Sequence, residues 1–275
     1  MGISSPVQRL GNALRAHGPW RTFRILGERL RHEFFPPPIP THPFDLEHGV
    51  DTSGLLFAEH LASGHAHDGH INAYWGTAPS GFRGILEQWQ HELSGTPYGI
   101  EDYTFLDIGC GKGRVLMLAS DAPFQRILGV ELSPALTAVA ENNMAKWSAA
   151  AHLCSDIEVL NLDALATPIP DSPVVLYIYN SFNLYVMLPL LDRLRTLALA
   201  RSTPIDLIYA TPQQAPLVDA VPGIALLAAG SIALTPEDRA ACAFASVKLD
   251  FRIYRFAPTS LQVPTAIPKM SPSPA

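Results

Sequence analysis

An α/β fold built on a mostly parallel sheet is predicted by three features of this sequence. Over residues 102–256, short apolar runs rich in β-branched residues alternate with longer stretches that suit crossover helices, a pattern typical of a parallel sheet covered on both faces. A glycine-rich turn follows the first of these runs. The 275 residues, of which 48% are hydrophobic, suffice for one such domain with an added segment.

The expected strands are short and lie in the second half of the chain. They span residues 103–108, 126–130, 157–160, 174–179 and 205–210, with a further candidate at 246–256 that suits an antiparallel strand at the end of the sheet. Ser133 and Pro134 open the helix after the second strand, because serine caps helices and proline is tolerated at their first position. The proline-rich residues 257–275 are predicted to be a disordered tail.

Residues 1–100 are expected to form a helical and loop-rich extension to a domain at residues 101–256. The first 35 residues carry six arginines against two glutamates, and apolar residues at steps of three and four favour an amphipathic helix. Docking of this helix on its own domain is the favoured interpretation, and binding to an anionic membrane surface or a partner is the alternative. A second helix is expected at residues 82–93, with Ser80 as its cap.

Four histidines cluster within this extension, at positions His60, His65, His67 and His70. Glycines between them favour a mobile loop, and neither an HExxH pattern nor a second group of ligands accompanies them. The sequence therefore predicts no metal site.

Charge and apolar patterning argue against several classes of protein. With 19 basic and 25 acidic residues the net charge is −6, so nucleic acid is not an expected partner. The longest apolar run, residues 224–234, is too short to cross a bilayer, and no secretory signal is recognisable, which predicts a cytoplasmic protein. Three widely separated cysteines predict reduced thiols rather than disulfides or a zinc site.

The most informative motif is FLDIGCGKGRVL, residues 105–116, in which an apolar strand runs into a glycine turn and a helix. Glycines at this place let a ligand approach the backbone. A P-loop would need serine or threonine after Lys112, and a dinucleotide fingerprint would need glycine in place of Arg114. These two cations are expected to serve packing and solvation. Asp107 suits a ligand that bears an ammonium group rather than a pyrophosphate.

These residues resemble the class I S-adenosylmethionine-dependent methyltransferases, and the resemblance covers residues 102–256. It implies a Rossmann-like, mostly parallel seven-stranded sheet with helices on both faces, and S-adenosylmethionine as cofactor. In that family the glycine loop holds the methionine part, the acid after the second strand holds the ribose, and the acid after the third strand lies near the adenine amino group. The corresponding cofactor residues are Asp107, Gly109, Gly111 and Gly113, then Glu131 and Leu132, then Asp163 and Ala164.

The fourth strand ends in YIYNSF, residues 177–182, where family members that methylate nitrogen carry an Asn-Pro-Pro or Asn-Pro-Phe type sequence. Asn180 corresponds to this asparagine, and Ser181 departs from the pattern. The expected catalytic residues are Asn180, which would aim an acceptor amine, and Tyr179 and Phe182, which with Tyr185 would form an aromatic wall favouring a developing cation.

Within the class, the motifs are similar to a bacterial group of unassigned methyltransferases and to the non-SET protein-lysine methyltransferases. The latter place a Tyr-x-Pro-Ser or Tyr-x-Pro-Thr element over the cofactor, to which Tyr74 and Thr77 correspond here, although the proline is absent. The resemblance implies methyl transfer to an unidentified acceptor, with a protein or lysine nitrogen favoured. A small-molecule N- or O-methyltransferase and a non-catalytic cofactor-binding module stay open, as does an NAD-dependent oxidoreductase, which Arg114 disfavours.

Overall fold

The computed structural model describes residues 40–148, 151–242 and 246–256. The predicted amphipathic helix near the N-terminus and the predicted disordered tail lie outside these residues. The described residues belong to one compact unit. None of their helices combines the length and the apolar character needed to cross a membrane.

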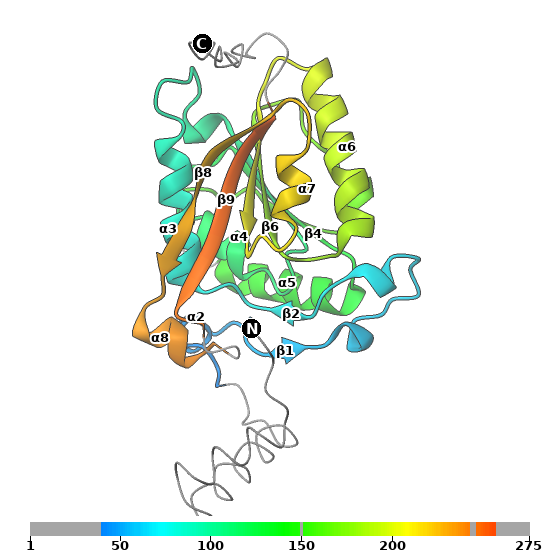
Figure 1. The fold of residues 1–275 in the computed structure, drawn as a ribbon. Helices are drawn as coiled ribbons and strands as arrows, with labels where there is room; N and C mark the ends of the chain where they lie inside the picture. Colours follow the sequence, from blue (N-terminus) through cyan, green and yellow to red (C-terminus); the bar gives the residue numbers. More distant parts are fainter. Residues whose placement is uncertain (1–39, 149–150, 243–245, 257–275) are drawn as a thin grey trace, which may run out of the picture. The chain divides into compact units, whose positions relative to one another are not determined.

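A seven-stranded sheet in the order β5-β4-β3-β6-β7-β9-β8 forms the centre of the fold (Figure 1). Its strands are β3 (Thr104–Ile108), β4 (Arg126–Glu131), β5 (Ile157–Asn161), β6 (Val174–Tyr179), β7 (Ile205–Ala210), β8 (Ile224–Ala233) and β9 (Lys248–Phe256). The strands from β5 to β7 pair in parallel, whereas β9 is antiparallel to both β7 and β8. The predicted mostly parallel, seven-stranded sheet is confirmed.

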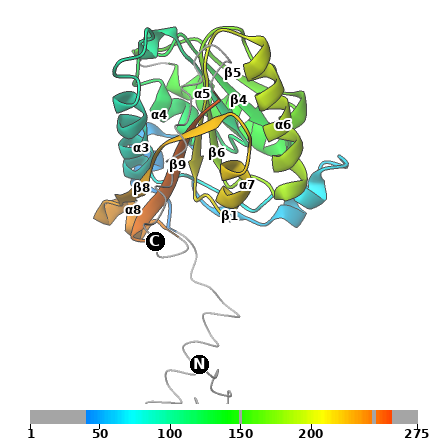
Figure 2. The ribbon, with the colours of Figure 1, turned by 45° about the horizontal axis from the view of Figure 1, so that its top comes forward.

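Helices cover both faces of this sheet (Figures 1 and 2). The helices are α2 (Pro43–His48), α3 (Pro79–His91), α4 (Arg114–Ala119), α5 (Pro134–Trp147), α6 (Leu184–Ala200), α7 (Ala215–Asp219) and α8 (Pro236–Ala240). Within β3, Phe105 joins the apolar cluster that contains residues of α3 and α4, while Leu106 joins the cluster that contains residues of α6 and α7. Because both faces are buried, every residue of β3 is buried, which explains the continuous apolar runs in the sequence.

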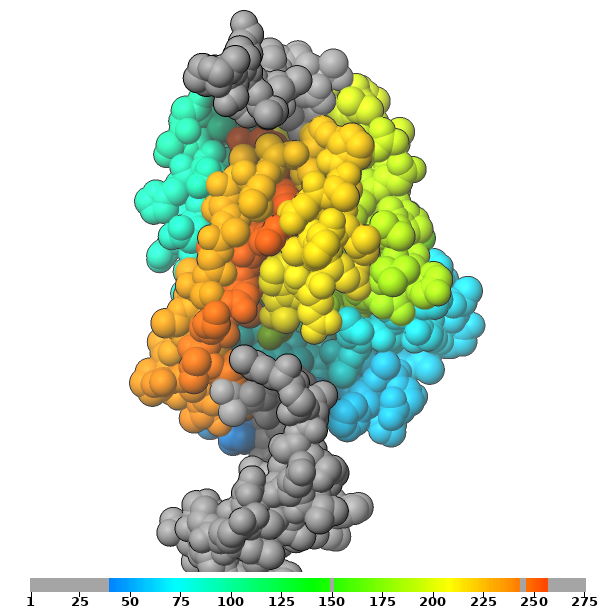
Figure 3. Space-filling model, in the orientation of Figure 1, coloured from blue at the N-terminus to red at the C-terminus, as the bar shows by residue number. Residues whose placement is uncertain are grey.

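The observed strands agree closely with the predicted ones except at the edge of the sheet formed by β8. β6 and β7 span the predicted residues, and the other four predicted strands are shifted by one or two residues at an end. β8 is the strand that the sequence analysis did not assign. It is an edge strand whose residues are exposed or half-buried, as Figure 3 shows for the orange segment, and Gly230 interrupts its apolar run. An edge strand of this kind lacks the buried pattern of the central strands.

The helix predicted at residues 82–93 is α3, and it begins earlier than expected. Pro79 occupies its first turn and Ala78 is its N-cap, without a side-chain hydrogen bond. Ser80 was therefore wrongly expected to cap this helix. Its hydroxyl and its backbone N–H both donate to the carboxylate of Asp238 in α8, which joins α3 to the far end of the chain.

Residues 40–77 are fixed to the sheet by two cations that follow the glycine turn. The Arg114 guanidinium donates from Nε to Thr52 Oγ1 at 2.6 Å and from Nη1 to Thr77 O at 3.1 Å, and lies 3.5 Å from an oxygen of Asp45. Lys112 Nζ donates to Asp51 Oδ1 at 2.7 Å. Lys112 is 8% exposed and Arg114 5%, so the expected packing role is confirmed, whereas the expected solvation of these side chains is wrong. They hold the N-terminal segment in place.

The acidic partner of this attachment, Asp45, is also buried. Burial alone would raise the pKa of Asp45, but hydrogen bonds from Thr52 and Ser53 and the charge of Arg114 together lower it. The Asp45 carboxylate is therefore kept ionised, chiefly by these hydrogen bonds and to a smaller extent by the charge of Arg114. Removing one partner of such a buried pair leaves the other uncompensated.

We expect Arg114→Met to reduce the free energy of unfolding by about 3–5 kcal/mol, because it leaves the buried carboxylate of Asp45 without its cationic partner. Arg126→Met is the matched control, since Arg126 is 43% exposed in its ion pair with Glu158 and its loss should cost below about 1 kcal/mol. Denaturant unfolding of both variants measures the difference. Equal losses in the two variants would contradict the attachment inferred for Arg114.

Candidate active site

A cavity opens where the carboxyl ends of β3, β4, β5 and β6 meet. It has a volume of about 880 Å³, which includes space open to solvent. The segment containing β1 (Leu55–Leu56) and β2 (Tyr74–Trp75) lies beside these strand ends (Figure 1). Residues 71–77 of this segment contribute to the cavity wall. In an open α/β sheet, this edge is where ligands bind.

The glycine turn is packed too closely for side chains. Gly109 and Gly111 line the cavity and have φ angles of 82° and 56°, in the left-handed region. A Cβ atom on Gly109 would lie 2.5 Å from the side chain of Ser181, and one on Gly111 would lie 2.3 Å from the ring of Tyr74. Gly113 differs from these two, because it is the N-cap of α4 and does not line the cavity.

Asp107 places a buried carboxyl group in the cavity wall without a hydrogen-bond partner among the described residues. It is 3% exposed, and its neighbours in the sheet are strands β4 and β6. Burial, and in second place the charge of Glu131, raises the pKa of Asp107 well above its ordinary value. A carboxyl group in this state is satisfied by a cationic ligand.

Glu131 ends β4 and is 7% exposed in the same cavity. Its two carboxylate oxygens accept hydrogen bonds from the backbone N–H groups of Gly111 and Ser133, each at 2.9 Å. Burial raises the pKa of Glu131, and these backbone donors partly oppose the shift. The carboxylate is thereby held beside the glycine turn, and the next residue, Leu132, also lines the cavity.

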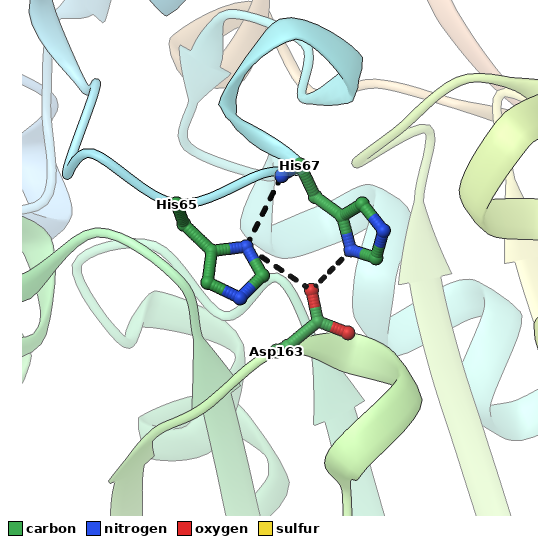
Figure 4. A group of neighbouring side chains, drawn as sticks. All are labelled: His65, His67 and Asp163. Atoms are coloured by element: carbon green, nitrogen blue, oxygen red, sulfur yellow. Dashed lines mark hydrogen bonds and ion pairs between the residues drawn. The ribbon is translucent and has the colours of Figure 1, made fainter.

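Asp163 follows β5 and lines the cavity together with Ala164. Its Oδ1 atom accepts a hydrogen bond from Leu165 N at 2.7 Å, which caps a short 3-10 turn, Ala164–Ala166. Its Oδ2 atom lies 2.6 Å from His67 Nδ1 (Figure 4). The carboxylate is therefore engaged by the histidine loop as well as by the cap.

The residues expected to cover the cofactor, Tyr74 and Thr77, both line the cavity. The Tyr74 hydroxyl donates to Thr52 O at 2.7 Å, which fixes its ring against Gly111. Thr77 Oγ1 lies 3.5 Å from the hydroxyl of Tyr177. Tyr177 was not singled out from the sequence, although it precedes Tyr179 by two positions and the two side chains must therefore lie on the same face of β6.

The end of β6 carries the expected catalytic residues. Tyr179 and Phe182 line the cavity, whereas Asn180 is not among its lining residues. Asn180 has a φ angle of 47°, its carbonyl accepts from Asn72 Nδ2 at 2.6 Å, and its Oδ1 atom is buried with no partner in the described part of the chain. Tyr185 is 65% exposed and stacks on His70, so it does not contribute to the aromatic wall as expected.

Ser181, the departure from the Asn-Pro pattern, has a structural role. Its hydroxyl donates to Ile108 O at 2.9 Å, and its side chain fills the space over Gly109. The end of β6 is thereby joined to the glycine turn.

The side chains that line this cavity fit S-adenosylmethionine. The carboxyl of Asp107 suits the ammonium of the methionine part, and the backbone of Gly109 and Gly111 lines the same cavity. The carboxylates of Glu131 and Asp163 are acceptors for hydroxyl and amino groups. A pyrophosphate would meet two buried acids here, which argues against a dinucleotide.

Comparison with known proteins supports this interpretation. Residues 105–203 match a family model described as a methyltransferase domain. No protein with a curated description matches the sequence.

Several solved structures are similar to parts of this chain, among them the following three. TrmN from Thermus thermophilus is 18% identical, with 63% of this chain and 47% of that chain covered and a TM-score of 0.42. The N-methyltransferase NodS from Bradyrhizobium japonicum WM9 is 14% identical, with 64% and 95% covered and a TM-score of 0.41. A dimethyladenosine transferase from Plasmodium falciparum is 14% identical, with 64% and 62% covered and a TM-score of 0.41. The chain thus spans about half the length of TrmN, and the acceptors of these proteins are not transferred to it.

The matched residues 105–203 contain the glycine turn, both strand-end acids that follow it and the end of β6. They therefore cover most of the cavity wall that the sheet provides. The chain has the Rossmann-like fold, and its residues 105–203 match a methyltransferase domain, for which S-adenosylmethionine is the methyl donor.

Proposed function

We propose that the protein transfers a methyl group from S-adenosylmethionine to an acceptor nitrogen, with a protein amine such as a lysine as the favoured acceptor. The observation that carries this proposal is the aromatic wall beside the unpartnered amide of Asn180. S-adenosylmethionine supplies a methyl group on a sulfonium, which is already activated for displacement. The chain then has to bind the methyl donor and the acceptor, align them with each other, and exclude water from the site.

The cofactor residues divide the cavity by chemistry. Asp107 would bind the ammonium, and Glu131 would accept hydrogen bonds from the ribose hydroxyls with Leu132 packed beside it. Gly109 and Gly111 would border the methionine part with their backbone, whereas Gly113 would act indirectly, by allowing the turn into α4. Asp163 and Ala164 would lie at the adenine, and Tyr74 and Thr77 would close the opposite side.

The acceptor side of the cavity is aromatic. Trp75, Tyr177, Tyr179 and Phe182 line it, and aromatic faces favour the positive charge that remains on a methylated amine. Burial raises the pKa of Tyr179 to about 12, and burial raises that of Tyr177 well above its usual value. Both phenols therefore stay protonated and act as walls and hydrogen-bonding groups, not as bases. The acceptor must arrive as the free amine, since a protonated one has no lone pair.

Asn180 is the residue that we assign to aiming this lone pair. Its Oδ1 atom needs a hydrogen bond that no described residue gives, and the amide follows directly after Tyr179. A turn of the side chain toward the cavity would let this oxygen accept from the acceptor N–H. The left-handed backbone at Asn180, which asparagine tolerates better than most residues, is a strained conformation of the kind found at active sites.

A second hollow, of about 420 Å³, offers a route for the acceptor. It shares Trp75, Gly76 and Tyr179 with the main cavity and extends past Thr211 to Cys242 and Lys248. Thr211 has a φ angle of 49°, which is rare for a β-branched residue, and it follows β7 as Asn180 follows β6. We assign this side to the incoming amine. A small-molecule amine would use the same route.

We expect the affinity for S-adenosylmethionine to fall as the pH is lowered, because protonation of Asp107, whose pKa burial raises well above its ordinary value, removes the charge that attracts the ammonium. Asp107→Asn should weaken binding by about 10–100-fold at neutral pH and flatten the pH profile, since an interaction with a charged group is lost. Calorimetric titration at several pH values measures both effects.

Methylthioadenosine, which keeps the nucleoside but lacks the ammonium, is the matched control for this experiment. Its affinity should be the same in the wild type and in Asp107→Asn. If the substitution weakens both ligands equally, Asp107 does not bind the ammonium.

We expect Asn180→Gly to lower kcat by roughly 100-fold, because the amine loses its alignment, while cofactor affinity changes little. Glycine accepts the positive φ angle of this position, so the backbone is kept. Asn180→Ala adds backbone strain, and a comparison of the two variants separates strain from loss of the amide. Single-turnover kinetics and cofactor titration are the measurements, and an equal loss in both quantities would refute the role.

The acceptor class is tested by incubating cell extract and the full chain with S-adenosylmethionine that carries a labelled methyl group. Label should enter protein, survive base and be recovered as methylated lysine, and the Asn180→Gly variant should give only background. Recovery of the label in RNA, in metabolites or in base-labile esters would overturn the protein-amine assignment. No label in any fraction would favour a module without catalytic activity.

A further inference from the structure

The histidine loop meets the cavity at Asp163. In this loop His65 and His67 stand one residue apart, and their Nδ1 atoms lie 3.7 Å and 2.6 Å from the same oxygen, Asp163 Oδ2 (Figure 4). One ligand atom from each of the three side chains lies within 4.8 Å of the others. The sequence analysis found no partner for these histidines, because the third group follows β5 and is 96 positions distant from His67.

Two imidazoles and a carboxylate form the ligand set of a transition-metal site. Zn²⁺ takes nitrogen and oxygen ligands of this kind, and three protein ligands leave a position for water. A metal ion would take the place of the direct contact between His67 Nδ1 and Asp163 Oδ2. It would also displace the hydrogen bond that His65 Nδ1 accepts from the His67 N–H at 3.1 Å. The side chains of His65 and His67 are 42% and 29% exposed, so an ion can enter from solvent.

The loop is folded around a different carboxylate, which leaves Asp163 available. Asp68 accepts hydrogen bonds from the backbone N–H groups of Ser63 at 2.8 Å, Gly64 at 2.7 Å and His65 at 3.0 Å. These bonds orient His65 and His67 toward Asp163 without an ion. A site that is already arranged loses less entropy on binding.

The other two histidines of the loop do not join this cluster. His70 stacks on Tyr185, and its Nδ1 atom lies 3.2 Å from Asn183 Nδ2. His60 is exposed at the end of a 3-10 turn, Ala58–His60. They therefore provide matched controls from the same segment.

We propose that His65, His67 and Asp163 bind a divalent transition-metal ion such as Zn²⁺, and that this ion opposes the binding of S-adenosylmethionine. The opposition rests on the proposed role of Asp163 at the adenine, since both His67 and Asp163 line the cofactor cavity. The Oδ1 atom of Asp163 is held by Leu165 N, so the ion and the cofactor would share the remaining acceptor capacity of this carboxylate. The coupling must be reciprocal.

The metal site is tested by calorimetric titration of the full chain with Zn²⁺ in the absence of cofactor. We expect His67→Gln and Asp163→Asn each to weaken Zn²⁺ binding by at least about 10-fold, and His60→Gln to leave it unchanged. Asp163→Asn keeps an oxygen for the Leu165 N–H, and thermal unfolding checks that every variant is folded. Titration with Co²⁺ should give visible absorption bands that His67→Gln abolishes. Zn²⁺ affinity that is equal in wild type and His67→Gln, or reduced equally by His60→Gln, would overturn the site.

The coupling is tested by titrating the wild type with S-adenosylmethionine with and without saturating Zn²⁺. The dissociation constant should rise with Zn²⁺, and His65→Gln should abolish this rise while leaving cofactor affinity without metal unchanged. A Zn²⁺ site that does not alter cofactor affinity would overturn the coupling. Failure of the metal experiments would leave the methyltransferase activity, which is measured without added metal, unaffected.

Discussion

Two buried carboxyl groups in one cavity are the constraint around which this structure is organised. Asp107 and Glu131 end neighbouring parallel strands, and burial raises the pKa of both. Glu131 is supported by two backbone N–H groups, whereas Asp107 has no hydrogen-bond partner among the described residues. Keeping such groups buried costs free energy in the free protein, and a cationic ligand offsets that cost. The strand ends are thus arranged for a ligand rather than for stability.

The N-terminal segment completes this arrangement from outside the sheet. Arg114 and Lys112 leave the glycine turn and hold residues 40–77 by hydrogen bonds, so the turn that lines the cavity also fixes the wall opposite to it. Tyr74 is consequently held against Gly111. Substitution of Arg114 or Lys112 would therefore alter both the stability of the protein and the shape of the cavity. Residues 40–77 are in this sense a structural part of the cavity.

The remaining wall consists of neutral aromatic rings, and the buried amide oxygen of Asn180, which has no partner among the described residues, lies outside the lining of the cavity. Tyr177 and Tyr179 keep their protons because burial disfavours the phenolate. These two tyrosines therefore do not act as bases, which agrees with our proposal that the acceptor arrives already deprotonated. At the other end of the cavity, the contact of His67 with Asp163 joins a surface loop to a residue that we assign to the cofactor. The two ends of the cavity thus differ in polarity and in exposure.

The sequence by itself determined the central strands, the glycine turn and the acids at the strand ends, because each depends on neighbouring residues and on strand periodicity. It did not determine what those residues contact. The partners of Arg114 and Lys112, the approach of His67 to Asp163 and the exclusion of Tyr185 from the cavity all depend on segments distant along the chain. Edge strand β8 was not predicted for a related reason. Its residues are exposed or half-buried, and they form a strand through pairing with β9. Local propensity fixes elements, whereas long-range packing decides which side chains share a cavity.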